Sequence, residues 1–508
     1  MSREQAEKLF DGITEIRDDL IEAALDAPLK SRRPRWKTWG AIAACAVVAI
    51  GFGGALRLLP FGGNAASGGG GHGEGSVFMS YAGPIFPLTL ENAEAGVSAA
   101  RNLTYDFGLT SEEAVRVWGG AVEDGYTLHN ASPEEKTVTA LYPFAGCFWD
   151  LQERLPTLTV EGQTVSPTLR VGSDSGDRSD SSGGDNAEGG GKRVHLGGWE
   201  DYQALLADGR YQTAAFSPPP TLAQTVTVYT FTEFQAPLED YEAATQAISF
   251  TIDPAKTTIF HYGFEGGELG ENGFRRYSYF VPEESSGRWA QTKQIIVLGE
   301  DLGDYAMEGY KNGACEPGNG LDGVRARVTR SNEGLSEVME RLSAEFLQQY
   351  QGKPPVSPEL FFGAASAFMN QTLSAGAREE PLFGHLESLF SEVGNLQRVF
   401  YLEVPITLPG GGDVSVTATL RQKPSFDYAC SGSEQLGIQG YDMVTSLGSN
   451  LPFDALTAAL TSTERIEIVR QNYGFDLPQG VKRVTLDPAV ERYYLEIRPV
   501  ELPEKPAA

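Results

Sequence analysis

The sequence predicts a mainly β fold, α+β overall, in which strands form a β-sandwich-like region and helices form one layer. Two patterns after residue 76 predict this fold. Short runs alternate apolar and polar side chains and are rich in Val, Ile, Thr, Phe and Tyr, and a stretch near 333–393 repeats apolar side chains at helical spacing. A long apolar run close to the N-terminus predicts a separate helix that would suit a membrane.

Residues 1–37 are expected to form an amphipathic helix followed by a basic collar. The apolar stripe of this helix repeats at helical spacing, and its opposite face is acidic. A helix of this length is marginal by itself, so the stripe needs a covering surface. We expect a cytoplasmic regulatory protein to bind there, with self-association or partial disorder as the alternatives. The candidate partner-binding residues are Leu9, Ile13, Ile16 and Leu20.

Residues 38–59 are expected to form one transmembrane helix. The run from Trp39 to Leu59 would extend about 31 Å as a helix, which matches the hydrocarbon thickness of a bilayer. The basic collar favours a cytoplasmic N-terminus, so residues 60–508 would be extracytoplasmic. A cleaved signal peptide has a shorter apolar core, and a lipoprotein box at Cys45 would have to end an apolar run that instead continues. The expected membrane-anchoring residues are Arg33, Arg35, Trp36, Lys37 and Trp39.

The composition narrows the choice of partners and cofactors. The formal net charge of −28 at pH 7 argues against nucleic acid or an anionic membrane surface as a partner of the exported part. Cys147, Cys315 and Cys430 are too widely spaced for a zinc pattern, so buried thiols are favoured over one disulfide with a spare thiol. The histidines are scattered along the chain. We therefore predict no metal and no cofactor, although distant side chains can converge in a fold.

The glycine-rich segment 60–76 predicts a flexible linker. Residues 77–217 are expected to form an exported β-rich domain of immunoglobulin type or a similar sandwich, with a disordered insert at 172–192. Turn-forming residues at 129–135 predict that the strands on either side pair as a hairpin. The expected strands are 76–81, 99–107, 125–130, 136–144 and 155–160, followed by a short helix at 199–206.

The triple proline at 218–220 is the strongest internal boundary, because proline interrupts both sheets and helices. Residues 221–500 are expected to form an exported α+β domain, and residues 501–508 a tail. The expected strands of this domain are 225–234, 247–252, 274–281, 292–298, 399–408, 414–421, 466–470, 483–486 and 492–497.

The helical layer of this domain is expected within about 333–393. An apolar stripe that begins at Leu335 predicts its first helix, with Ser331 or Asn332 as the N-cap. Further helices are expected at 358–373, 385–393 and 453–460. Four large side chains in the helix at 358–373 are expected to belong to the core rather than to a ligand groove; they are Phe361, Phe362, Phe368 and Met369.

Catalytic motifs are missing from the sequence. It contains no G-x-S-x-G in register, no P-loop, no dinucleotide fingerprint, no H-E-x-x-H and no C-x-x-C. The paired carboxylates of a glycoside hydrolase come from distant strands, so the sequence singles out no such pair. We therefore predict no catalytic residues and a region that is not an enzyme, with a cell-envelope hydrolase as the least favoured alternative.

Roughly the first 50 residues resemble single-pass membrane proteins of anaerobic Firmicutes that have an anti-sigma-like N-terminal layout. The motifs that carry the resemblance are Leu9-Phe10-Asp11-Gly12-Ile13 in the acidic helix, Arg35-Trp36-Lys37 in the collar and Ala43-Ala44-Cys45 in the span. The resemblance implies a cytoplasmic segment that holds a transcription factor and an exported region that senses an unknown extracellular ligand. The zinc-binding His and Cys pattern of many anti-sigma domains is missing.

The expected function is therefore that of a membrane-anchored extracytoplasmic sensor or regulatory protein with a non-catalytic exported region. The alternative is a surface-anchored binding or scaffold module whose N-terminus serves only as an anchor. The apolar stripe of the N-terminal helix separates the two hypotheses, because only the first requires it to bind a partner.

Overall fold

The computed structural model describes residues 83–108, 120–174, 203, 219–237, 244–281, 292–350, 355–374, 384–427 and 437–500. All of these residues belong to one compact unit of the chain, residues 64–508. The predicted N-terminal helix, collar, membrane span and linker lie outside the described residues, and so do all candidate partner-binding and membrane-anchoring side chains. The strand at 76–81, the tail at 501–508 and, apart from Gln203, the helix at 199–206 also lie outside them.

The predicted membrane localisation needs correction. Among the helices in the described part of the chain, none is both long enough and apolar enough to cross a membrane. The predicted single pass at 38–59 lies outside the described residues, so no described helix supports it. The prediction of a single-pass membrane protein, with a cytoplasmic N-terminus and residues 60–508 extracytoplasmic, is therefore contradicted by the helices that the structure describes.

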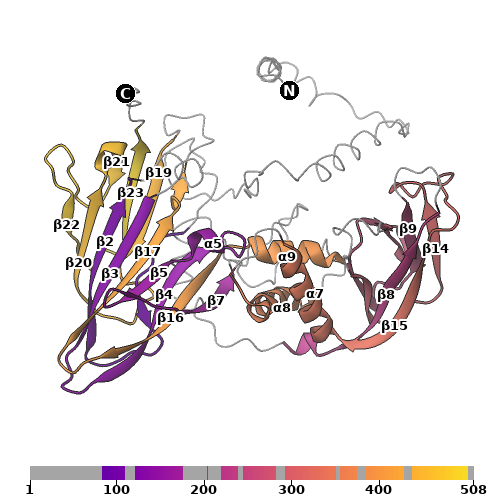
Figure 1. The fold of residues 1–508 in the computed structure, drawn as a ribbon, viewed down its shortest axis with the longest axis horizontal. Coiled ribbons are helices and arrows are strands. Elements are labelled where there is room, and N and C mark those ends of the chain that lie inside the picture. The colour runs from indigo at the N-terminus through magenta and orange to yellow at the C-terminus, as the bar shows by residue number, and fades with distance from the viewer. Residues whose placement is uncertain are drawn as a thin grey trace, which may run out of the picture. The chain divides into compact units, whose positions relative to one another are not determined.

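Strands dominate the described part of the chain, which confirms the mainly β prediction (Figure 1). A seven-stranded sheet has the order β22-β20-β2-β3-β17-β5-β6, and two four-stranded sheets have the orders β1-β4-β16-β7 and β18-β19-β23-β21. Ile85 connects the two smaller sheets, because it precedes β1 and forms backbone hydrogen bonds of 2.9 Å with Asp442 and Val444 around β19.

These three sheets form a β-sandwich with a shared core. Every second residue of β2 is buried, starting at Val97, and β3 shows the same alternation. Tyr105 on β2 packs edge-on against Tyr441 on β19, with ring centroids 6.0 Å apart. The strand bounds are β1 (Thr89–Leu90), β2 (Val97–Asp106), β3 (Gly120–Asn130), β4 (Lys136–Gly146), β5 (Thr157–Val160), β6 (Gln163–Thr164), β7 (Thr168–Asp174), β16 (Arg398–Leu408), β17 (Asp413–Gln422), β18 (Phe426–Asp427), β19 (Gln439–Val444), β20 (Phe453–Thr461), β21 (Ile466–Gln471), β22 (Arg483–Thr485) and β23 (Arg492–Pro499).

The turn at 131–135 does not close a hairpin, so that prediction was wrong. Strand β3 pairs with β2 and β17, whereas β4 pairs with β1 and β16. The chain therefore crosses from one sheet of the sandwich to another at this turn. Asn130 fixes the crossing, because its side-chain amide donates to the carbonyl oxygens of Glu134 at 2.8 Å and Leu408 at 3.3 Å.

The predicted helix at 453–460 is strand β20, so that prediction was also wrong. Strand β20 lies between β2 and β22, parallel to the former and antiparallel to the latter. Both of its edges are therefore hydrogen-bonded. Leu456, Ala458 and Leu460 point into the sandwich core. Pairing on both sides outweighs the helical preference of a segment rich in Ala and Leu.

The sandwich is built from two separate parts of the chain. Strand β7 ends at Asp174 directly opposite Arg398, where β16 begins, so the intervening elements form an insertion. Strands on both sides of the triple proline pair with one another, as in β4 with β16 and β3 with β17. The predicted boundary at 218–220 therefore does not separate the sheets. Residues 172–174 of the predicted disordered insert belong to β7, and the rest of that insert lies outside the described residues.

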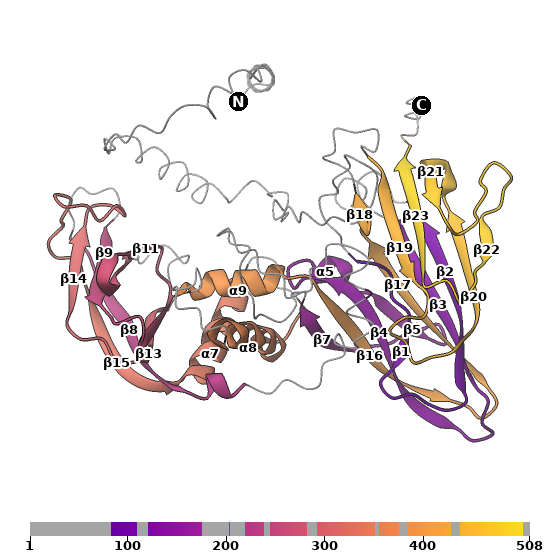
Figure 2. The same cartoon turned by 180° about the vertical axis from the view of Figure 1, so that it is seen from behind.

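The inserted part contains two further antiparallel sheets (Figure 2). One has the order β10-β13-β8-β15 and the other has the order β11-β12-β9-β14. Large apolar side chains such as Phe231, Phe264 and Tyr279 form a core between them. The strand bounds are β8 (Thr225–Gln235), β9 (Thr245–Thr251), β10 (Thr257–Tyr262), β11 (Gly266–Leu269), β12 (Phe274–Phe280), β13 (Lys293–Gly299), β14 (Tyr305–Tyr310) and β15 (Arg325–Gly334).

Three helices pack against the other face of the β10-β13-β8-β15 sheet: α7 (Leu335–Gln349), α8 (Pro358–Ser374) and α9 (Leu386–Asn395). Their positions agree with the predicted helices. The four large side chains of α8 that were expected to be core are buried in it. The predicted N-cap was wrong, because Ser331 and Asn332 lie in β15 and Gly334 is the capping residue.

Candidate functional site

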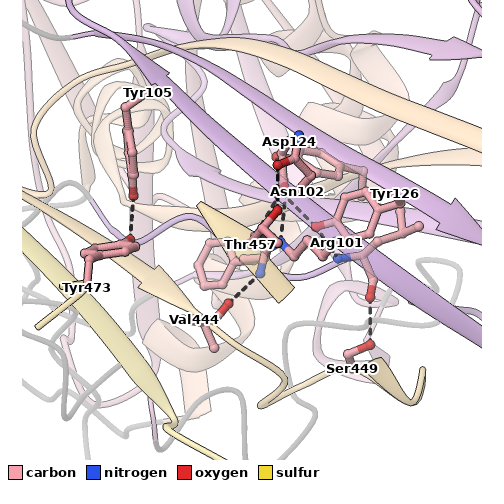
Figure 3. A network of polar contacts seen from close by, with 12 residues as sticks. Arg101, Asn102, Tyr105, Asp124, Tyr126, Val444, Ser449, Thr457 and Tyr473 are labelled. Atoms are coloured by element: carbon pink, nitrogen blue, oxygen red, sulfur yellow. Dashed lines mark hydrogen bonds and ion pairs between the residues drawn. The ribbon is translucent and has the colours of Figure 1, made fainter. Parts of the chain in front are cut away.

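A buried ion pair lies at the centre of the sandwich (Figure 3). The side chains of Arg101 on β2 and Asp124 on β3 are fully buried, and the guanidinium donates to both carboxylate oxygens at 2.8 Å. The same guanidinium donates to the backbone carbonyls of Val444 at 2.6 Å and Phe86 at 3.0 Å. The pair therefore ties the seven-stranded sheet to β19 and to the segment that precedes β1.

Two tyrosines complete this ion-pair network. Tyr126 donates its hydroxyl hydrogen to Asp124 at 2.7 Å and accepts from the Leu88 N–H at 3.0 Å, and Tyr142 on β4 donates to Asp124 at 3.2 Å. Burial raises the pKa of both tyrosines, so they stay neutral donors. Burial alone would lower the pKa of Arg101, but the Asp124 carboxylate outweighs this effect and raises it. The polar groups of this network are bound to one another, so they stabilise the sandwich rather than face a substrate.

A second polar cluster lies where α9 meets the β10-β13-β8-β15 sheet. It combines imidazole, carboxylate and ammonium groups around one glycine backbone. We call it the histidine–carboxylate cluster; it consists of His261, Gly263, Glu265, Lys293, His385 and Glu387.

Gly263 is the centre of the histidine–carboxylate cluster. Its backbone N–H donates to the Glu387 carboxylate on α9, and its carbonyl accepts from the Lys293 ammonium at 2.8 Å. The residue has a φ of 80°, and a Cβ atom here would lie 2.4 Å from the carbonyl oxygen of Thr292. Only glycine fits this conformation and this close approach. The local sequence therefore places the N–H and the carbonyl of one residue within reach of a carboxylate and an ammonium group, respectively.

The two histidines stack on each other. The ring centroids of His261 on β10 and His385, which precedes α9, are 5.0 Å apart. His385 is held by its neighbours, because Nδ1 lies 2.7 Å from the Ser388 hydroxyl and Nε2 lies 3.1 Å from Glu387 Oε2. The Nδ1 atom of His261 is buried and has no hydrogen-bond partner among the described residues. Burial lowers the pKa of both rings and so disfavours a positive charge on them, although the Glu387 carboxylate lies beside His385.

The charged members of the cluster also sit in a poorly solvated setting. Burial raises the pKa of Glu387 to about 7, although the Gly263 N–H opposes the shift. The Lys293 side chain is fully buried and lies 3.7 Å from the Glu265 carboxylate. Burial lowers the pKa of Lys293 and raises that of Glu265, and each charge partly offsets the shift of the other. The protonation state of the cluster is therefore strongly coupled to its burial.

The cluster contains group types that serve as acids and bases in enzymes, and most of its polar atoms, with the exception of His261 Nδ1, contact other parts of the protein. Among the described residues, this cluster included, no group of three or more His, Cys, Asp or Glu side chains is arranged to hold a metal ion. The chemistry that this arrangement supports is proton uptake and release at a contact between secondary-structure elements. The prediction that no catalytic residue and no cofactor is present stays a prediction.

Sequence reasoning missed the cluster. It treated the histidines as scattered, yet folding stacks His261 on His385. A weak signal was present, because β10 and β13 are apolar strands that carry His261 near the end of one and Lys293 at the start of the other. Polar residues of this kind inside a buried strand indicate a polar contact, but they do not identify the partner.

Two of the predicted buried thiols are in the structure. Cys147 and Cys315 are buried and are not part of a disulfide, whereas Cys430 lies outside the described residues. Burial raises the pKa of Cys147 to about 11 and also raises that of Cys315.

We expect both thiols to react slowly with iodoacetamide in the folded protein, because the thiolate is the reactive form and each group is shielded. Mass spectrometry of peptides should find Cys147 and Cys315 largely unmodified at neutral pH and fully modified after denaturation. Rapid labelling of Cys147 in the folded protein would contradict this assignment.

Comparison with known proteins gives no identification at this point. No protein-family model matches the chain, and the search of curated proteins found no match.

Proposed function

We propose that this protein is a sensor or regulatory protein whose β-rich region serves recognition rather than catalysis. The observation that carries the proposal is that the polar side chains of the ion-pair network, and most of those in the histidine–carboxylate cluster, bind other parts of the protein. Arg101 and Asp124 hold three sheets together, and Glu387 joins α9 to a neighbouring sheet. A fold stabilised in this way offers sheet surfaces and loops for binding.

The second part of the proposal concerns the N-terminal stripe of Leu9, Ile13, Ile16 and Leu20. Its apolar spacing supports a contact with a regulatory partner protein, since an isolated helix of this length needs a covering surface. The two parts together describe a chain that recognises a signal through its β-rich region and passes it on through its N-terminal segment.

Substitution of Ile13 and Ile16 by aspartate tests this proposal. Two charges placed in an apolar contact are expected to weaken partner binding by about 100-fold or more, because each buried charge costs about 2 kcal/mol or more. Transcript profiling of cells that carry the double variant should match the profile of cells from which the gene has been deleted.

The matched control replaces Asp11 by asparagine and Glu15 by glutamine on the acidic face, and it should leave transcripts unchanged. If the Ile13→Asp/Ile16→Asp cells resemble wild type while the deletion strain differs, the regulatory role fails. The protein would then be a binding or scaffold module that acts without its N-terminal stripe.

A further inference from the structure

The contact between α9 and the β10-β13-β8-β15 sheet buries several ionisable side chains that serve neither the sandwich nor the proposed partner surface. His261 is 8% exposed, and the side chains of Glu387 and Lys293 are 14% and 0% exposed. Glu387 is the member on α9 that reaches the sheet, through the Gly263 N–H. A change of charge on either side of this contact changes its free energy, since little water remains to solvate the charge.

We propose that the histidine–carboxylate cluster makes the docking of α9 on this sheet depend on pH. Ionised Glu387 loosens the contact at alkaline pH, and protonated histidines loosen it at acidic pH.

The alkaline limit follows from Glu387. Burial raises its pKa from 4.5 to about 7 in the docked state. A carboxyl group with a raised pKa contributes stability that is complete below its undocked value of about 4.5. This contribution is lost as the pH rises to about 7, because the docked state then has to hold a buried carboxylate.

The acid limit follows from the histidines. Burial, together with the neighbouring His385, lowers the pKa of His261 from 6.5 to about 3, and burial lowers that of His385 as well. The contribution of His261 to stability is complete above about pH 6.5 and is lost as the pH falls towards 3, and the contribution of His385 is lost in the same direction. Between about pH 4.5 and 6.5 the carboxyl and imidazole contributions oppose each other, so the contribution of each group is seen separately only in a variant that lacks the other.

The Lys293 ammonium attracts ionised Glu387 across the contact and so opposes the alkaline limit, but burial is the larger effect and the pKa of Glu387 stays raised. Lys293 and Glu265 both belong to the sheet side of the contact, so their mutual interaction persists when α9 moves. The titratable groups that face the contact are His385 and Glu387 from α9 and its N-terminus, His261 and Tyr262 from β10, Glu265 from the turn after β10, Tyr277 and Tyr279 from β12, Lys293 from β13 and Glu345 from α7.

Hydrogen exchange of the full-length protein, corrected for intrinsic rates, measures the opening of α9 at each pH. The variant Glu387→Gln keeps an acceptor for the Gly263 N–H but cannot ionise. At about pH 8, its opening equilibrium for the α9 amides should be about 10- to 100-fold smaller than that of wild type, and the two proteins should converge near pH 4.5. The variant His261→Phe keeps an aromatic ring and should lessen the loss of α9 protection below pH 6.

The control Glu340→Gln removes an exposed carboxylate from α7 and should leave the α9 profile unchanged. Identical pH profiles for wild type and Glu387→Gln at α9 between pH 4.5 and 8 would overturn the proposal. If a variant does not fold, hydrogen exchange of the wild-type protein across the same pH range tests the proposal. Protection of the α9 amides that varies with pH while protection of the α7 amides stays constant supports it. The same pH dependence in both helices refutes it.

Discussion

Replacing Arg101 by methionine should destabilise the sandwich by about 3–5 kcal/mol. The substitution leaves the fully buried Asp124 carboxylate without its cation, and removal of one partner of a buried ion pair has a cost of this size. It also removes the donors to the carbonyls of Val444 and Phe86, which connect the sheets. Chemical denaturation followed by circular dichroism measures the loss in the free energy of unfolding.

Two further variants test whether the unpaired Asp124 carboxylate causes this loss: a double variant that removes both charges, and a control that breaks an exposed ion pair. Arg101→Met combined with Asp124→Leu removes both charges, so it should be more stable than Arg101→Met alone, with a coupling energy of about 1–3 kcal/mol. Arg327→Met breaks a pair in which both side chains are 63% exposed, and it should change stability little. A loss from Arg101→Met no greater than that from Arg327→Met would show that the buried pair does not hold the sheets together.

Replacing Gly263 by alanine is expected to cost about 2–4 kcal/mol. An L-residue at a φ of 80° is strained by about 1–2 kcal/mol, and the added Cβ meets the Thr292 carbonyl oxygen at 2.4 Å, where the backbone has to move. The shift separates the Gly263 peptide from Glu387 and Lys293, so the protection of α9 against hydrogen exchange should fall along with global stability.

Gly162→Ala is the matched control for this substitution. Gly162 has a φ of 72°, but nothing lies within 4 Å of the position its Cβ would take, so it should show only the conformational strain of about 1–2 kcal/mol. Equal losses in Gly162→Ala and Gly263→Ala would mean that the close approach to Thr292 does not constrain the fold.

Elements whose pattern reflects their own burial could be predicted from sequence. The alternation in β2 and the apolar stripe of α7 both arise because one face of the element meets the core, so periodicity alone locates them. Strand β20 was missed because its Ala-rich and Leu-rich sequence favours a helix, while pairing with β2, far away in the chain, determines the outcome.

Contacts between distant residues could not be predicted in the same way. The turn at 131–135 was recognised, but its sequence does not say that β3 pairs with β17 rather than with β4. The candidate site depends on the same kind of information, because the stacking of His261 on His385 requires β10 and α9 to meet. Residue types indicated which groups can titrate, and only the fold brings them together.

The parallel pairing of β2 with β20 has a consequence for synthesis on the ribosome. The sheets and helices of the insertion lie between residues 220 and 395, so they are complete long before the ribosome reaches Phe453. Until β20 emerges, β2 is a nascent sheet edge with apolar side chains on one face. Such an edge is prone to pair with other chains, so slow translation or truncation upstream of residue 453 should expose the protein to aggregation and create a demand for chaperones.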